Sequence, residues 1–182
     1  MNPLPHVFLL GVTAALCSAH DSVTQGMEFL RAYMPEQDKP VITEERLKRE
    51  VRLALDVRSR FPWAGKVPWE VYENDVLPYA VVNEPRDEWR EQFRNLFAPL
   101  VSSCKTGREA ALTVAACIQK TLHVKYSTER RVPHQGVKES LESGKVSCTG
   151  QSILLICALR SIGIPASMAG VVTWNHVRGN HN

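Results

Sequence analysis

The sequence predicts an α+β protein in which helices come first and a helix followed by a strand comes last. Residues 44–58 repeat apolar side chains at intervals of three and four, as in an amphipathic helix. Residues 151–159, QSILLICAL, are apolar around nearly the whole circumference of a helix, which predicts a central position. Gly163 and Pro165 end this helix, and residues 166–174 are expected to form a buried strand. This order of elements is typical of an α+β fold.

Three further helices are expected between these segments. Residues 85–96 carry aromatic side chains spaced four apart, a stripe typical of core packing, with Asn83 as the expected N-cap. Residues 106–109, TGRE, form a capping box that opens the next helix. A short helix is expected over residues 137–142, ended by Gly144.

Length and charge exclude several classes of protein. A chain of 182 residues suits one domain, or one small domain with an extension, and its core needs no disulfide or metal. The net charge is only +3, and the basic residues are interspersed with acidic ones. A surface for nucleic acid is therefore not expected.

The first 19 residues predict a secretory signal peptide. A run of apolar and small residues from Val7 to Leu16, interrupted only by Thr13, precedes Cys17-Ser18-Ala19, with small residues at −3 and −1 of a cleavage point after Ala19. The run is too short to span a bilayer, so we expect an exported protein, periplasmic or extracellular, without stable membrane insertion. The early residues lack Lys and Arg, which leaves a buried element of a cytosolic protein as the alternative. Lipoprotein cleavage before Cys17 is disfavoured because Leu16 is bulky.

Cys148 is the candidate nucleophile, because it lies where a short loop becomes the predicted central helix. The amino end of a helix presents unpaired N–H groups that stabilise a thiolate and the oxyanion of a tetrahedral intermediate. His181 and His176 are the candidate bases, and His181 lies 33 positions after Cys148. Their separation of five residues would place them on opposite faces of one strand, so at most one could meet Cys148. Spacing alone does not choose between them.

The segment SGKVSCTGQSILLICALRSIGIPAS resembles the nucleophile helix of the transglutaminase-like superfamily. The similarity comprises Cys148 at a helix start, then Ala158-Leu159-Arg160 and Gly163-Ile164-Pro165-Ala166. Asn180-His181-Asn182 resembles the family's histidine context and favours His181 over His176. The stretches VRLALDVRSRFPW and VLPYAVVNEPRDEWR resemble the helical N-terminal part of exported bacterial members, so the resemblance covers about residues 45–182.

The resemblance implies a papain-like or transglutaminase-like core, truncated at its C-terminus, in which the Cys-bearing helix packs on an incomplete antiparallel sheet. It divides the chain into the signal peptide (residues 1–19), a helical region (20–100) and the core (101–182). The implied reaction is acyl transfer on an amide of a protein or peptide, with a thioester on Cys148 and His181 as base. No cofactor or metal is implied. The family's third catalytic residue, Asp or Asn, would follow Asn182, so this chain is expected to have weak activity or none.

The residues leave other interpretations open. The thioester could pass to water, as in a peptidase or amidase, or to an amine, as in cross-linking; for exported bacterial members hydrolysis is favoured. The fold could instead serve as a non-catalytic binding module, with contacts from Trp63, Trp69 and Trp174. A zinc site from Cys148, Cys157, His176 and His181 is disfavoured, because no C-x(2–4)-C pair is present. Nothing in the sequence indicates the oligomeric state.

Overall fold

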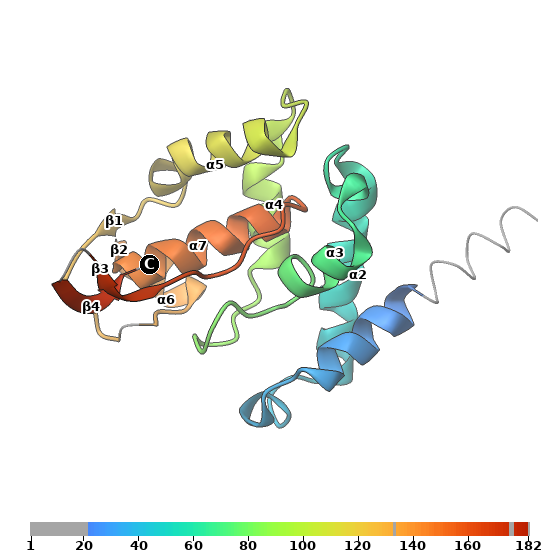
Figure 1. Ribbon diagram of the computed structural model, residues 1–182, viewed down its shortest axis with the longest axis horizontal. Helices are drawn as coiled ribbons and strands as arrows, with labels where there is room; N and C mark the ends of the chain where they lie inside the picture. The colour runs from blue at the N-terminus through green and yellow to red at the C-terminus, as the bar shows by residue number, and fades with distance from the viewer. Residues whose placement is uncertain (1–21, 133, 175–176, 182) are drawn as a thin grey trace, which may run out of the picture. The chain divides into compact units, whose positions relative to one another are not determined.

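The computed structural model describes residues 22–132, 134–174 and 177–181 (Figure 1). The chain divides into two compact units, one ending at Arg52 and the other beginning at Leu53. The signal peptide expected over residues 1–19 lies outside the described residues. Among the residues that are described, no helix is both long enough and apolar enough to cross a bilayer.

The first unit contains a helix over residues 22–32, a short 3-10 turn, Glu36–Asp38, and the start of helix α2, Glu44–Arg60, which continues into the second unit. The amide of Arg46 donates to Oγ1 of Thr43 over 3.2 Å, so Thr43 caps α2 as its position in the sequence suggests. The predicted helix over residues 44–58 is thus confirmed and ends two residues later than expected.

The second unit holds the remaining elements. Its helices are α3 (Trp69–Asp75), α4 (Arg90–Phe97), α5 (Gly107–Thr121), α6 (Val137–Ser143) and α7 (Cys148–Ser161), with 3-10 turns η2 (Ala64–Lys66) and η3 (Pro99–Val101). Its strands are β1 (Lys125–Tyr126), β2 (Lys145–Val146), β3 (Val171–Trp174) and β4 (Val177–His181). The strands β1 and β2 pair in parallel, whereas β3 and β4 form an antiparallel pair. The α+β class is confirmed.

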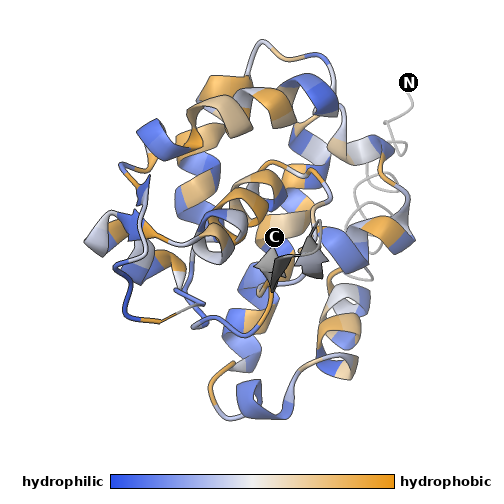
Figure 2. Ribbon diagram, turned by 60° about the vertical axis from the view of Figure 1, so that its left-hand side comes forward, coloured by the Kyte–Doolittle hydropathy of each residue, from blue (hydrophilic) through white to orange (hydrophobic). Residues whose placement is uncertain are grey.

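Helix α7 is the centre of the second unit. It contacts α4, α5, α6 and β2, and Figure 1 shows it between α5 and α6. Several of its turns carry the hydrophobic colour in Figure 2, and Ile153, Leu154 and Cys157 are almost completely buried. The aromatic stripe of α4 packs in the same core, with Phe93 and Phe97 fully buried. Both expectations, a central helix and aromatic core packing, are confirmed.

Both ends of α5 are fixed by hydrogen bonds between residues close together in the sequence. Thr106 and Glu109 form the predicted capping box, with the amide of Glu109 donating to Oγ1 of Thr106 over 3.2 Å. At the other end the amide of Val124 donates to the carbonyl of Gln119 over 3.0 Å. His123 adopts a positive φ of 54° there, which completes a Schellman-type ending.

The predicted start of the fourth helix at residue 85 is wrong, because α4 begins at Arg90. The carboxylate of Glu84 accepts the amides of Val81 and Val82, at 2.7 and 2.8 Å, and the amide of Asp87 donates to the carbonyl of Pro85. These local bonds hold residues 81–87 in turns, in competition with a helix. Asn83 therefore caps no helix.

The buried strand predicted over residues 166–174 is wrong in extent and in burial. Only Val171–Trp174 is a strand, and both Val171 and Thr173 are exposed. The amide of Ala166 donates to the carbonyl of Asp75 over 3.1 Å, and the carbonyl of Ala166 accepts from Nε of Arg160 over 2.9 Å. These bonds satisfy both backbone polar groups of Ala166, so this residue needs no neighbouring strand.

Tyr72 makes the stability of the second unit sensitive to alkaline pH. Its hydroxyl is buried and donates to the carbonyl of Ala54 over 2.5 Å, and burial raises the pKa of Tyr72 to about 12. An unfolded tyrosine loses its proton near pH ~10, so stability is intact below that pH and falls as the pH rises toward 12. We expect a loss of about 3 kcal/mol in the free energy of unfolding across this window.

The measurement is urea unfolding at several pH values between 9 and 12. Tyr72→Phe should reduce the fall in the free energy of unfolding over this range. The lost hydrogen bond should lower that free energy by about 1 kcal/mol at neutral pH. Tyr126→Phe is the matched control, because Tyr126 is exposed. An equal flattening by both substitutions would contradict the assignment to Tyr72.

Candidate active site at the start of helix α7

Cys148 is the first residue of α7, and Ser147 is its N-cap. Oγ of Ser147 accepts the amide of Gly150 over 3.0 Å, and the carbonyl of Ser147 accepts the amide of Gln151 over 2.9 Å. The thiol of Cys148 is exposed, whereas Cys157 is buried. The sequence thus correctly predicts that this cysteine stands at the amino end of a buried helix.

The loop before Cys148 is held by backbone pairing. The amide of Lys125 donates to the carbonyl of Gly144, and the amide of Ser127 donates to the carbonyl of Val146, both over 2.9 Å. Gly144 has a positive φ of 63°, which lets α6 end and the chain turn directly into β2. Cys148 therefore closely follows a hydrogen-bonded strand, β2, rather than a free loop.

Gln135 packs against the turn before Cys148 and is almost completely buried, with 1% of its surface exposed. Its Nε2 donates to the carbonyl of Lys145 over 2.9 Å. Its Oε1 lies 3.3 Å from the point that a Cβ on Gly150 would occupy, as does Cβ of Val146. Gly150 thus fits a site with little room for a side chain. No pattern in the sequence points to Gln135, because its partners come from segments 10 to 15 residues away.

The first turn of α7 can stabilise negative charge. The opening N–H groups of a helix have no acceptor within the helix, and they lie at the positive end of its dipole. Ser147 takes the amides of Gly150 and Gln151, while the amide of Cys148 lies ahead of both. A carbonyl under attack by the thiol would develop negative charge on its oxygen. This oxygen could accept a hydrogen bond from the amide of Cys148, as in an oxyanion hole.

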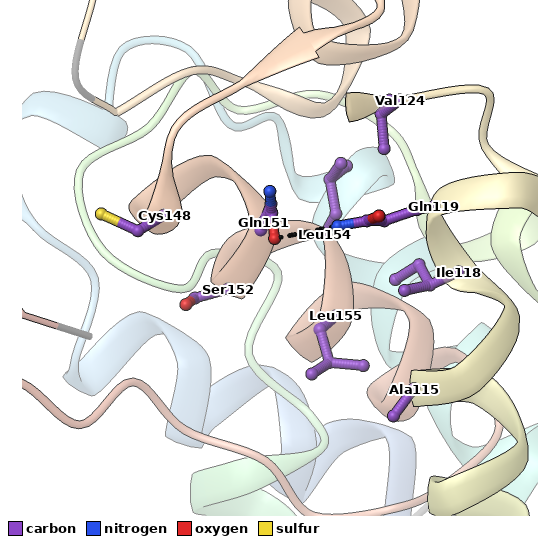
Figure 3. Close-up of a pocket in the computed structure, with 9 residues that line it drawn as sticks. All are labelled: Ala115, Ile118, Gln119, Val124, Cys148, Gln151, Ser152, Leu154 and Leu155. Atoms are coloured by element: carbon purple, nitrogen blue, oxygen red, sulfur yellow. Dashed lines mark hydrogen bonds between the residues drawn. The ribbon is translucent and has the colours of Figure 1, made fainter. Parts of the chain in front are cut away.

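A groove adjoins Cys148 along the seam between α5 and α7 (Figure 3). Its volume is about 270 Å³. It is lined by Ala115, Ile118, Gln119, Val124, Cys148, Gln151, Ser152, Leu154 and Leu155. The side chains of Gln119 and Gln151 join across the seam, with Nε2 of Gln119 donating to Oε1 of Gln151 over 3.2 Å.

Of the two candidate bases, one lies within the described residues and the other does not. His181 is the last residue of β4, and its backbone is opposite Val171 of β3. His176 lies outside the described residues. Whether the imidazole of His181 meets the thiol of Cys148 remains a prediction.

Two residues named in the alternative interpretations, Trp63 and Cys157, are buried. Trp63 is buried and its Nε1–H donates to the carbonyl of Ile162 over 2.8 Å, so it anchors the end of α7 rather than offering a binding contact. Cys148 is exposed at the start of α7 and Cys157 is buried, and nine positions along one helix place them on opposite faces. Among the described residues, no group of three or more His, Cys, Asp or Glu side chains could hold a metal ion.

Comparison with known proteins extends over the part of the chain that holds this site. The family model of the transglutaminase-like superfamily matches residues 94–182. This segment belongs to the transglutaminase-like superfamily. The transglutaminase-like segment begins within α4 and includes α5, α6 and α7, together with Cys148 and His181. No curated protein and no solved structure matches the chain.

Proposed function

We propose that this protein performs cysteine-dependent acyl transfer on amide bonds of a protein or peptide, with Cys148 as nucleophile and His181 as base. One observation carries the proposal: an exposed thiol stands at the first residue of a buried helix and adjoins a groove. Membership of the transglutaminase-like superfamily supports the same class of chemistry.

In the first half of the proposed reaction, the sulfur of Cys148 attacks the amide carbonyl. The carbonyl oxygen becomes an oxyanion, which the amide of Cys148 can stabilise. His181 takes the thiol proton and delivers it to the departing amine, so the C–N bond breaks as a thioester remains on the enzyme. In the second half, His181 deprotonates water, which attacks the thioester and releases a carboxylic acid and the free thiol.

We favour hydrolysis over cross-linking as the outcome. In cross-linking an amine would replace water in the second half, and the chemistry at Cys148 would be the same. If residues 1–19 act as a signal peptide, the substrate would be met in the periplasm or outside the cell.

The proposal predicts that Cys148 is unusually reactive toward iodoacetamide. At pH 7 we expect alkylation at least about tenfold faster than that of glutathione, because the helix end and an imidazole both stabilise a thiolate. The measurement is the second-order rate constant on the whole protein, with the site of alkylation read by peptide mass spectrometry. His181→Ala should slow the reaction.

The control variant is Cys104→Ser, which removes a half-buried cysteine outside this site and should leave the rate unchanged. Cys148→Ser should abolish the fast phase. A Cys148 rate equal to that of glutathione would refute the nucleophile assignment.

A further inference from the structure

The seam between α5 and α7 joins the candidate nucleophile to an apolar wall. Cys148, Gln151 and Leu155 are separated by three and four residues along α7, so they share one face of the helix. Ala115 and Ile118 of α5 line the groove opposite them. Figure 3 shows Cys148 at one end of the groove with its sulfur directed away from Ala115 and Ile118, so a side chain next to the attacked carbonyl would turn back along α7 to reach the aliphatic side chains.

We propose that this groove is the subsite for an aliphatic side chain of the acyl donor, carried by the residue whose carbonyl Cys148 attacks. This inference rests on the proposed function and names the substrate class it acts on. The subsite favours uncharged aliphatic residues such as leucine over glycine, aspartate or lysine.

The charge of the groove supports this choice of occupant. None of its lining residues is charged. A carboxylate or ammonium group placed there would lose water without gaining a partner of opposite charge. An aliphatic side chain would instead meet Ile118, Leu155 and the buried faces of Val124 and Leu154.

The size of the groove limits the occupant further. A volume of about 270 Å³ is slightly smaller than typical small-molecule sites, which begin near ~300 Å³. It accommodates one side chain with part of its backbone. The groove therefore selects a single residue of the substrate.

The two glutamine side chains supply polar contacts at the same place. Each amide has two N–H donors and an oxygen with two lone pairs, and the bond between Gln119 and Gln151 uses only part of this capacity. The remaining donors and acceptors suit a peptide backbone that enters beside them. This combination of apolar walls with a few polar groups is typical of ligand sites.

The test compares two affinity labels that alkylate Cys148 with loss of chloride, acetyl-leucine chloromethyl ketone and acetyl-glycine chloromethyl ketone. In the whole protein we expect the leucine label to react about tenfold faster or more, because its side chain leaves water. Acetyl-lysine chloromethyl ketone should show no such gain. Equal rates for the leucine and glycine labels would overturn the subsite.

Variants of α5 locate the effect in the groove. Ala115→Trp should fill the groove and bring the leucine-to-glycine ratio close to one, and the smaller Ala115→Met should give an intermediate ratio. Leu112→Trp is the matched control, because Leu112 lies on the same helix and is exposed like Ala115, but does not line the groove. A ratio unchanged by both Ala115 variants would overturn the assignment.

Iodoacetamide tests the nucleophile independently of the subsite, because it has no side chain to place in the groove. If iodoacetamide reacts rapidly while the leucine preference is absent, the nucleophile stands and the subsite fails. If iodoacetamide also reacts slowly, the proposed function itself fails.

Discussion

Gly163→Ala is expected to lower the free energy of unfolding of the second unit by about 3 kcal/mol or more. Gly163 has a positive φ of 75°, where an L side chain is strained by roughly 1–2 kcal/mol. A Cβ at this position would also overlap Cβ of Ala64 and lie 3.2 Å from Cγ1 of Val57. Urea unfolding followed by tryptophan fluorescence measures the loss, because Trp63 is buried beside this contact.

Gly144→Ala is the matched control for the backbone contribution. Gly144 also has a positive φ, 63°, but its nearest neighbour is the carbonyl oxygen of His123 at 3.3 Å. This substitution should reduce stability by only about 1–2 kcal/mol. Ala64→Gly combined with Gly163→Ala should recover the part due to overlap. Equal losses in the two single variants would show that the overlap with Ala64 is relieved by a small shift.

Arg160→Met is expected to destabilise the second unit by about 4 kcal/mol. The guanidinium of Arg160 is buried and donates to four carbonyls, those of Asp75, Pro78, Ala80 and Ala166, at 2.7–3.2 Å. Methionine fills a similar volume but leaves these acceptors without their donor. Burial lowers the pKa of Arg160 to about 10, so the side chain is still protonated at neutral pH.

The measurement is again urea unfolding at pH 7, with Arg130→Met as control. Arg130 is exposed and its guanidinium donates to the carbonyl of Thr128, two residues away, so its loss should change stability by less than about 0.5 kcal/mol. Arg160→Lys should restore little, because an ammonium cannot reach acceptors spread around a planar guanidinium. Full recovery with lysine would show that charge, not hydrogen-bond geometry, is what this site requires.

Both variants also bear on the candidate active site. Gly163 and Arg160 lie at the end of α7, far along the helix from Cys148, and their neighbours hold that end in the core. A variant that remains folded should therefore keep the iodoacetamide reactivity of Cys148. Thermal unfolding and alkylation rates on the same samples distinguish loss of the fold from loss of the reactivity of Cys148.

Local patterns in the sequence predicted most helices of the core and the position of Cys148 at the start of α7. The capping box at Thr106, the apolar run of α7 and the stop at Gly163 act within a few residues, so they can be read along the chain. For the same reason Cys148 could be placed at a helix start. The resemblance to the transglutaminase-like superfamily also came from such short segments, and the family match over residues 94–182 confirms it.

The tertiary structure alone decided what these local patterns do not contain. Arg160 reaches carbonyls as many as 85 residues away, Gln135 packs under the turn of Cys148, and α5 meets α7 to form the groove. The turns before α4 and the short strand β3 likewise follow from particular side-chain contacts with backbone groups. The contacts of Arg160, Gln135 and the α5–α7 groove depend on atoms from separate segments meeting in space, and the free energy of such contacts leaves no periodic trace in the sequence.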